Sequence, residues 1–120
     1  MKKMKITYTE RLIMKVMWDS PEELSVPEIA DKAQEDFDVI WSNSTVSCYM
    51  AMLRDKGFVA MTRHSSIRYT YRCILTEQEY KREFHEKEVE FWCKGDRIDY
   101  VCSILDSLGI YDLDGFHLND

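Results

Sequence analysis

The chain has 120 residues and a mass of 14.3 kDa, a size that accommodates one ordinary domain with a small arm and excludes large multidomain enzymes. Hydrophobic residues make up 45% of it, and glycine and proline are scarce, so the composition gives little support to a disordered or fibrous protein. The formal net charge of -6 would argue against nucleic acid binding if it were evenly spread, because Lys and Arg must neutralise phosphates.

The charge is not evenly spread along the chain. Residues 1–75 carry 11 Lys/Arg and 10 Asp/Glu, whereas residues 76–120 carry 5 and 12. Residues 54–72 form a short basic segment in which Asp55 is the single acidic residue. Its cations are Arg54, Lys56, Arg63, Arg68 and Arg72. This asymmetry predicts that the first part contacts an anion and that the second part has a different role.

Two helices are predicted near the start of the chain. Thr7 followed by Glu10 is a capping box that opens a helix over about 8–19, and a second capping box at Ser25–Glu28 opens a helix over about 26–36. Their helical spacing predicts burial of Leu12, Ile13, Val16, Met17, Ile29, Ala30 and Ala33. The residues expected to cover the exit of the second helix are Phe37, Val39, Ile40 and Trp41.

A third helix is predicted over about 43–56. Ser42 is its N-cap, and Gly57 is suited to a left-handed C-cap. The face expected to be buried is formed by Val46, Tyr49, Met50 and Leu53. The opposite face consists of Ser44, Cys48, Ala51 and Asp55, flanked by Thr45 and Ser47. A helix that enters a DNA groove needs short polar side chains on such a face, but an ordinary solvated helix has a similar pattern.

After Gly57 the hydrophobic period changes to two, which predicts a hairpin. Its strands are expected at Phe58–His64 and Arg68–Ile74, joined by a short turn. The residues expected to pack inward are Tyr69, Tyr71 and Cys73, and those expected to face outward are Arg68, Thr70 and Arg72. Three helices followed by a hairpin predict a mainly α fold with a small β-hairpin wing. This is the winged helix-turn-helix, so residues 1–75 are interpreted as a DNA-binding domain.

The second part is predicted to contain two more helices. Thr76 with Glu79 opens a long helix that ends near Gly95, and another helix continues to Gly109. These helices are too few to close a core alone, so residues 76–120 are interpreted as a helical dimerisation region. The residues expected at the dimer contact are Tyr80, Phe84, Phe91, Trp92, Ile98, Val101, Leu105 and Leu108.

Other function classes find little support in the sequence. No apolar run approaches the roughly 20 residues that cross a bilayer, and charges interrupt the apolar stretch near the start, so a soluble cytoplasmic protein without membrane contact is expected. The four cysteines lack the close pairs of zinc or redox motifs, and no catalytic motif is present, so we expect no metal, no cofactor, no catalytic residues and no enzyme activity. Cys48 leaves open a response to oxidation.

The residues that match the pattern of a known family are Glu10, Met14, Lys15, Val16, Trp18, Ile29, Ala30, Trp41, Ser42, Thr45, Val46, Leu53, Lys56 and Gly57. Over about residues 7–105, the sequence thus resembles the penicillinase repressor family of bacterial winged-helix regulators. This resemblance implies an N-terminal DNA-binding domain, a C-terminal helical dimerisation region, and a homodimer that represses transcription from a palindromic operator.

The chain also departs from the family pattern. Asn43 and Ser44 stand where the family has proline and lysine, Cys48 replaces a threonine, and Met52 replaces an arginine, so two cations are missing from the third helix. Some family members are cleaved at an asparagine–phenylalanine bond. In this chain that position falls near Ser103–Ile104, where neither asparagine nor phenylalanine is retained. The operator, the inducing signal and any upstream sensor or protease therefore do not carry over.

The sequence predicts a set of DNA contacts on the third helix and the wing. These residues are Ser42, Asn43, Ser44, Thr45, Ser47, Cys48, Arg54, Lys56, Arg63, Arg68 and Arg72. The cations are expected at phosphates, where they set register and affinity rather than sequence preference. The alternative is a winged-helix protein-interaction module that has lost DNA binding, which the missing cations and the acidic second part favour.

Overall fold

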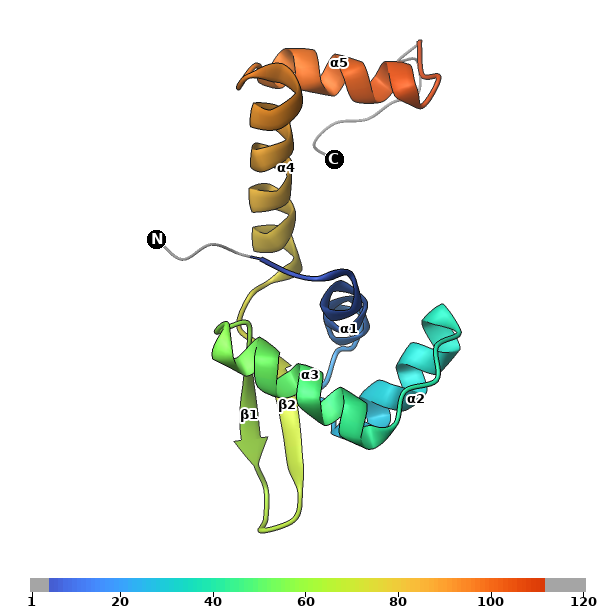
Figure 1. The fold of residues 1–120 in the computed structure, drawn as a ribbon, viewed down its shortest axis with the longest axis vertical. Helices are drawn as coiled ribbons and strands as arrows, with labels where there is room; N and C mark the ends of the chain where they lie inside the picture. Colours follow the sequence, from blue (N-terminus) through green and yellow to red (C-terminus); the bar gives the residue numbers. More distant parts are fainter. Residues whose placement is uncertain (1–4, 112–120) are drawn as a thin grey trace. The chain divides into compact units, whose positions relative to one another are not determined.

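A computed structural model describes residues 5–111 of the chain (Figure 1). Its elements are α1 (Tyr8–Trp18), α2 (Val26–Phe37), α3 (Asn43–Asp55), β1 (Val59–Arg63), β2 (Tyr69–Cys73), α4 (Glu77–Cys93) and α5 (Arg97–Ser107). The predicted fold class, mainly α with a β-hairpin wing, is confirmed. The chain forms two compact units, Met1–Tyr80 and Lys81–Asp120, so the first turn of α4 belongs to the first unit. Residues 112–120, the end of the expected dimerisation region, lie outside the described residues.

The helices begin where the capping boxes predict. At α1, the Glu10 amide donates to Thr7 Oγ1 over 3.2 Å and the Thr7 amide donates to Glu10 Oε1 over 3.0 Å. The same reciprocal bonds join Ser25 to Glu28 at α2 and Thr76 to Glu79 at α4. Each box satisfies two of the backbone N–H groups that a helix leaves without a partner at its start.

The core of the first unit lies between the three helices and the hairpin that projects from them (Figure 1). Its buried apolar residues are Ile13, Met14, Val16, Met17, Leu24, Ile29, Ala33, Val46, Met50, Leu53, Phe58, Val59, Tyr71 and Leu75. The helix faces predicted from periodicity are therefore largely confirmed. Ile40 is an exception: it was expected to cover the exit of α2, but 82% of it is exposed, whereas Phe37, Val39 and Trp41 pack against the core as expected.

The hairpin corrects one prediction about which residues face outward. Thr70 was expected on the exposed face with the arginines, but it is buried. The reason is a third backbone segment: Leu24 pairs with Tyr71 through two hydrogen bonds of 3.2 and 2.8 Å, and this brings Glu23 over Thr70. Strand alternation predicts which residues face outward only if that face of the hairpin is open to solvent. Here the loop before α2 partly covers it.

The end of α3 leads directly into the hairpin. Gly57 has a φ of 80°, the left-handed conformation that glycine adopts without steric cost. Its amide donates to the Arg54 carbonyl over 2.9 Å, and the Phe58 amide donates to the Leu53 carbonyl over 3.0 Å, which is the Schellman arrangement. The C-cap predicted from the sequence is confirmed.

The second unit, taken by itself, exposes much of its apolar surface. The turn between α4 and α5 has left-handed conformations at Lys94 and Gly95, and the Asp96 carboxylate caps α5 by accepting from the Asp99 amide over 3.0 Å. Exposed apolar residues in this unit are Phe84, Phe91, Trp92, Ile98, Val101, Leu108 and Tyr111. Among residues 5–111, no helix is long and apolar enough to span a bilayer.

Candidate nucleic-acid interface

The exposed face of α3 presents short polar side chains. Ser44, Ser47 and Cys48 are exposed, while Val46 and Met50 on the opposite side are fully buried. The helix is thus attached to the core along one side and open along the other. The structure places these three candidate DNA contacts together on one accessible surface.

Ser42 and Thr45 are tied to each other at the start of α3. Ser42 Oγ accepts from the Thr45 amide over 3.1 Å and donates to Thr45 Oγ1 over 3.0 Å. Ser42 thus caps the helix, and its hydroxyl proton is donated to Thr45. The first turn of α3, which contains Asn43, has no acidic side chain. An uncharged first turn leaves the partial positive charge of the helix N-terminus open to an anion.

Lys56, an expected phosphate contact, is paired within the protein. Its ammonium lies 2.6 Å from Glu10 Oε1 and 2.8 Å from the Lys5 carbonyl oxygen. Because only 1% of Glu10 is exposed, this ammonium neutralises a carboxylate that water does not reach. Lys56 therefore holds the end of α3 to the start of α1.

The pKa of Glu10 reflects the same arrangement. Burial of the carboxyl acts to raise its pKa, but hydrogen bonds from Lys56 and Thr7, together with the charge of Lys56, outweigh burial and lower the pKa overall. Glu10 is consequently a carboxylate at neutral pH. The sequence identified Glu10 as a capping residue and missed its ion pair.

Two arginines stand near the tip of the wing. Arg63 is exposed, its Nε donates to the Ser65 carbonyl over 3.3 Å, and its guanidinium lies 5.4 Å from the centre of the Tyr69 ring. Arg68 is exposed, and its carbonyl oxygen closes the turn by accepting from the amides of His64 and Ser65. Both guanidinium groups are accessible, as a phosphate contact requires.

The other two cations of the hairpin region lie in different surroundings. Arg72 is nearer the base of the wing, and its Nη1 donates to Thr62 Oγ1 over 3.1 Å. Its charge also acts on Glu23, whose carboxylate lies on the same side of the hairpin. Arg54, in the last turn of α3, is exposed and lies 3.9 Å from the Met61 sulfur. Both arginines are exposed.

A polar chain that the sequence did not reveal crosses the wing. Thr70 Oγ1 donates to Glu23 Oε1 over 2.7 Å and lies 2.7 Å from His64 Nε2. A hydroxyl has one proton, and a carboxylate only accepts, so His64 must carry its proton on Nε2 and donate to Thr70. Hydrogen bonds from Thr70 and Thr62, aided by the charges of Arg72 and His64, lower the pKa of Glu23. Because Glu23 and Thr70 are 47 residues apart, no local pattern predicts the contact.

Most residues expected at the dimer contact lie on the second unit, but Tyr80 does not. Its ring packs against Trp18 in the first unit, with 5.5 Å between ring centres. Leu105 is half-buried. The remaining six of the expected residues are exposed and stay candidates for an intermolecular contact: Phe84, Phe91, Trp92, Ile98, Val101 and Leu108.

The cysteines have different surroundings in the described part of the chain. All four are free thiols, and burial raises the pKa of Cys73 to about 11. Cys48 and Cys102 are exposed. Within residues 5–111, no group of three or more His, Cys, Asp or Glu side chains has the arrangement of a metal site.

The comparisons with known proteins agree with this architecture. The family model described as "Penicillinase repressor" matches residues 6–118. A search of curated proteins finds no match. Among solved structures, an ArsR-like transcriptional regulator from Rhodococcus sp. RHA1 is similar with a TM-score of 0.50 and 16% identity, over 84% of this chain and 83% of that one. At this identity the likeness concerns the fold.

Proposed function

Because this chain belongs to the penicillinase repressor family, we propose that it is a DNA-binding transcriptional regulator that acts as a homodimer and represses transcription from a palindromic operator. The observation that carries the proposal is the two-sided α3, which is buried along Val46 and Met50 and open along Ser44, Ser47 and Cys48. A helix held in this way can enter the major groove without loss of the core.

In this proposal, α3 supplies few strong contacts to bases. The hydroxyls of Ser44, Ser47 and Thr45 can bond either base edges or phosphates, and Asn43 lies at the helix start. None of these side chains has the bidentate geometry that Arg brings to guanine. Sequence preference then depends on a few hydroxyl contacts together with the shape of the DNA.

The wing supplies the electrostatic part of the affinity. Arg63 and Arg68 are the accessible cations near its tip, and Arg54 adds a third at the end of α3. Lys56 contributes less, because its ammonium is paired with the buried Glu10 carboxylate. Arg72, which is exposed and donates to Thr62 Oγ1, adds a further cation nearer the base of the wing. With so few accessible cations, affinity for DNA is modest and falls steeply as salt is added.

A second copy of the chain is the partner proposed for the second unit. Its exposed apolar residues are Phe84, Phe91, Trp92, Ile98, Val101 and Leu108. In a lone chain these side chains would remain in contact with water. Two copies related by a twofold axis would place two α3 helices on half-sites about one helical turn apart, or a multiple of it.

Selection of bound sequences from random duplex DNA by the full chain tests this function. We expect enrichment of a palindrome with a fixed half-site spacing, and binding whose logarithm falls linearly with the logarithm of salt concentration. Ser44→Ala should change the preferred bases by a few-fold in relative affinity. Ser103→Ala, an exposed serine of α5, is the matched control and should leave the preference unchanged.

The second candidate function is a winged-helix protein-interaction module without DNA binding. The observation that favours it is the absence of cations along α3 before Arg54. Failure of the full chain to bind any duplex at low salt, while it remains folded and dimeric, would support this candidate and contradict the first.

A further inference from the structure

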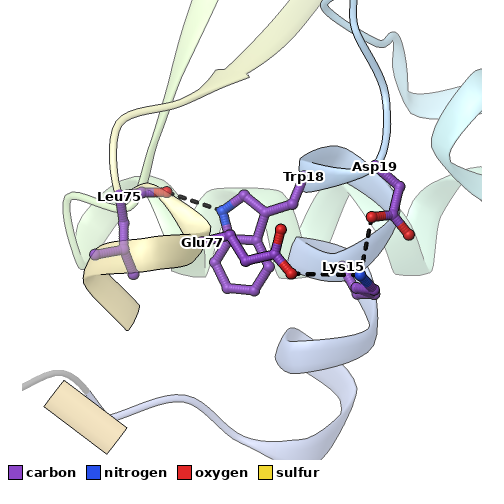
Figure 2. A network of polar contacts seen from close by, with 5 residues as sticks. All are labelled: Lys15, Trp18, Asp19, Leu75 and Glu77. Carbon is purple, nitrogen blue, oxygen red and sulfur yellow. Dashed lines mark hydrogen bonds and ion pairs between the residues drawn. The ribbon is translucent and has the colours of Figure 1, made fainter. Parts of the chain in front are cut away.

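The start of α4 and the residues just before it are attached to α1 through two polar contacts (Figure 2). Trp18 Nε1 donates to the Leu75 carbonyl oxygen over 2.9 Å. The Lys15 ammonium lies between two carboxylates, 2.9 Å from Asp19 Oδ1 and 3.3 Å from Glu77 Oε2. Within the first unit, both contacts connect α1 with the short segment that leads into α4.

An apolar contact strengthens this attachment. The Tyr80 ring packs against the Trp18 ring at 5.5 Å between centres, with 38° between their planes. Leu75 is 8% exposed and belongs to the core, and Tyr80 packs against the same core. The indole of Trp18 therefore contacts this segment in two ways: its N–H bonds to Leu75, just before α4, and its ring packs against Tyr80 of α4.

The segment between β2 and α4 is too short and too well bonded to act as a flexible linker. The amides of Ile74 and Leu75 both donate to the Phe58 carbonyl oxygen, over 2.8 and 3.1 Å. Phe58 is also the residue whose amide closes the end of α3, by donating to Leu53. These hydrogen bonds thus connect the last turn of α3 with Ile74 and Leu75, just before α4.

From these contacts we infer that Trp18 and Lys15 are positioning residues that set the spacing between the two half-sites the dimer accepts. The inference rests on the proposed function. The 17-residue helix α4 begins on the DNA-binding unit and continues into the unit proposed to dimerise. If the first turn of α4 is held against α1, the helix leaves the DNA-binding unit in one direction. If that turn is loose, the two α3 helices of a dimer can reach half-sites of several spacings.

Two conservative variants loosen the anchor without removing its bulk. Trp18→Phe removes the indole N–H but keeps an aromatic ring beside Tyr80, and Lys15→Met removes the ammonium but keeps a chain of similar length. Lys87→Met is the matched control, since it removes an ammonium from an i,i+4 pair with Glu83 within α4. Thermal unfolding of each variant verifies that it remains folded.

The experiment measures affinity for a series of duplexes. The starting duplex is the one that the wild-type chain selects from random DNA, and its spacer is then changed by one or two base pairs. The preference is the ratio of affinities for the selected spacing and for the altered ones. We expect this ratio to be about fivefold smaller in the double variant Trp18→Phe/Lys15→Met than in the wild type, the factor that corresponds to one net hydrogen bond. Lys87→Met should retain the full preference.

Hydrogen exchange reports on the anchor without DNA. In the double variant, the Tyr80 amide, which donates to the Thr76 carbonyl over 3.0 Å, should exchange several-fold faster than in the wild type. Unchanged exchange, or faster exchange with an unchanged spacing preference, overturns the positioning role and leaves the proposed function intact. Failure of the wild-type chain to select any duplex overturns both.

Discussion

At the scale of single residues, the structure separates cations that look alike in the sequence. Lys56 and Arg68 both belong to the basic segment that suggests contact with an anion. Lys56 is bonded to the buried carboxylate of Glu10, whereas Arg68 is exposed near the tip of the wing. The number of cations without a carboxylate partner in the basic segment is therefore smaller than the composition implies.

The ion pair at Glu10 leads to a prediction about stability. Lys56→Met leaves a buried carboxylate without its partner and should lower the free energy of unfolding by about 3 kcal/mol, measured by urea denaturation. Adding Glu10→Gln to this variant should recover part of the loss, because the amide carries no charge to be left unpaired. Equal stability of Lys56→Met and the wild type would contradict the proposed role of the pair.

The lowered pKa of Glu10 also predicts how stability depends on pH. A carboxyl whose pKa is lower in the folded state than its unfolded value of 4.5 binds its proton less readily when folded. The stability it contributes is fully present above pH 4.5 and is lost as the pH falls through the lowered pKa. Urea denaturation from pH 7 to pH 3 should show this loss in the wild type and a weaker dependence in Glu10→Gln.

At the scale of elements, α3 and the wing differ in how the protein holds them. α3 ends in a Schellman arrangement at Gly57 and is anchored by its buried face, so its open face is rigidly presented. The wing is a two-stranded hairpin that gains a third backbone partner at Leu24. In the proposed complex, α3 provides the sequence preference and the wing provides affinity.

Charge reversal in the wing tests this division. Arg63→Glu with Arg68→Glu should weaken binding to all duplexes by tenfold or more and reduce the slope of the salt dependence by about four, because the proposed dimer loses two phosphate contacts in each copy. A gel-shift titration at several salt concentrations measures both effects. Arg82→Glu with Lys94→Glu changes the net charge equally on α4 and its exit, so a comparable loss there would show that overall charge is responsible.

At the scale of the whole molecule, the two units differ in the surface that they leave uncovered. The first unit has a continuous apolar core between its helices and hairpin. The second unit leaves large apolar side chains exposed, with Phe91 at 73% and Ile98 at 74%. This difference is the basis for the proposed dimer, because a second copy would remove that surface from water.

The dimer can be tested on the full chain. Ile98→Asp places a charge within the proposed contact and should convert a dimer to a monomer at micromolar concentration, measured by sedimentation equilibrium. Ser103→Asp adds the same charge on the same helix outside the proposed contact set and should remain a dimer. A wild-type chain that sediments as a monomer would contradict the proposal.

The sequence by itself determined the seven elements, the buried faces of the three helices and the left-handed glycine that ends α3. Capping boxes, helical periodicity and strand alternation act between residues a few positions apart, so they can be recognised without a structure. The expected face of α3 follows from the same local geometry. The DNA contacts expected of Ser44, Ser47 and Cys48 remain predictions.

Only the tertiary structure decided which polar groups meet. Lys56 bonds to Glu10 across 46 residues, Thr70 to Glu23 across 47, and Trp18 to Leu75 across 57. These pairs determine which cations stay accessible, why Thr70 is buried and where α4 is anchored. Local patterns specify the backbone of a short segment, whereas the partner of a side chain depends on which distant segments packing brings beside it.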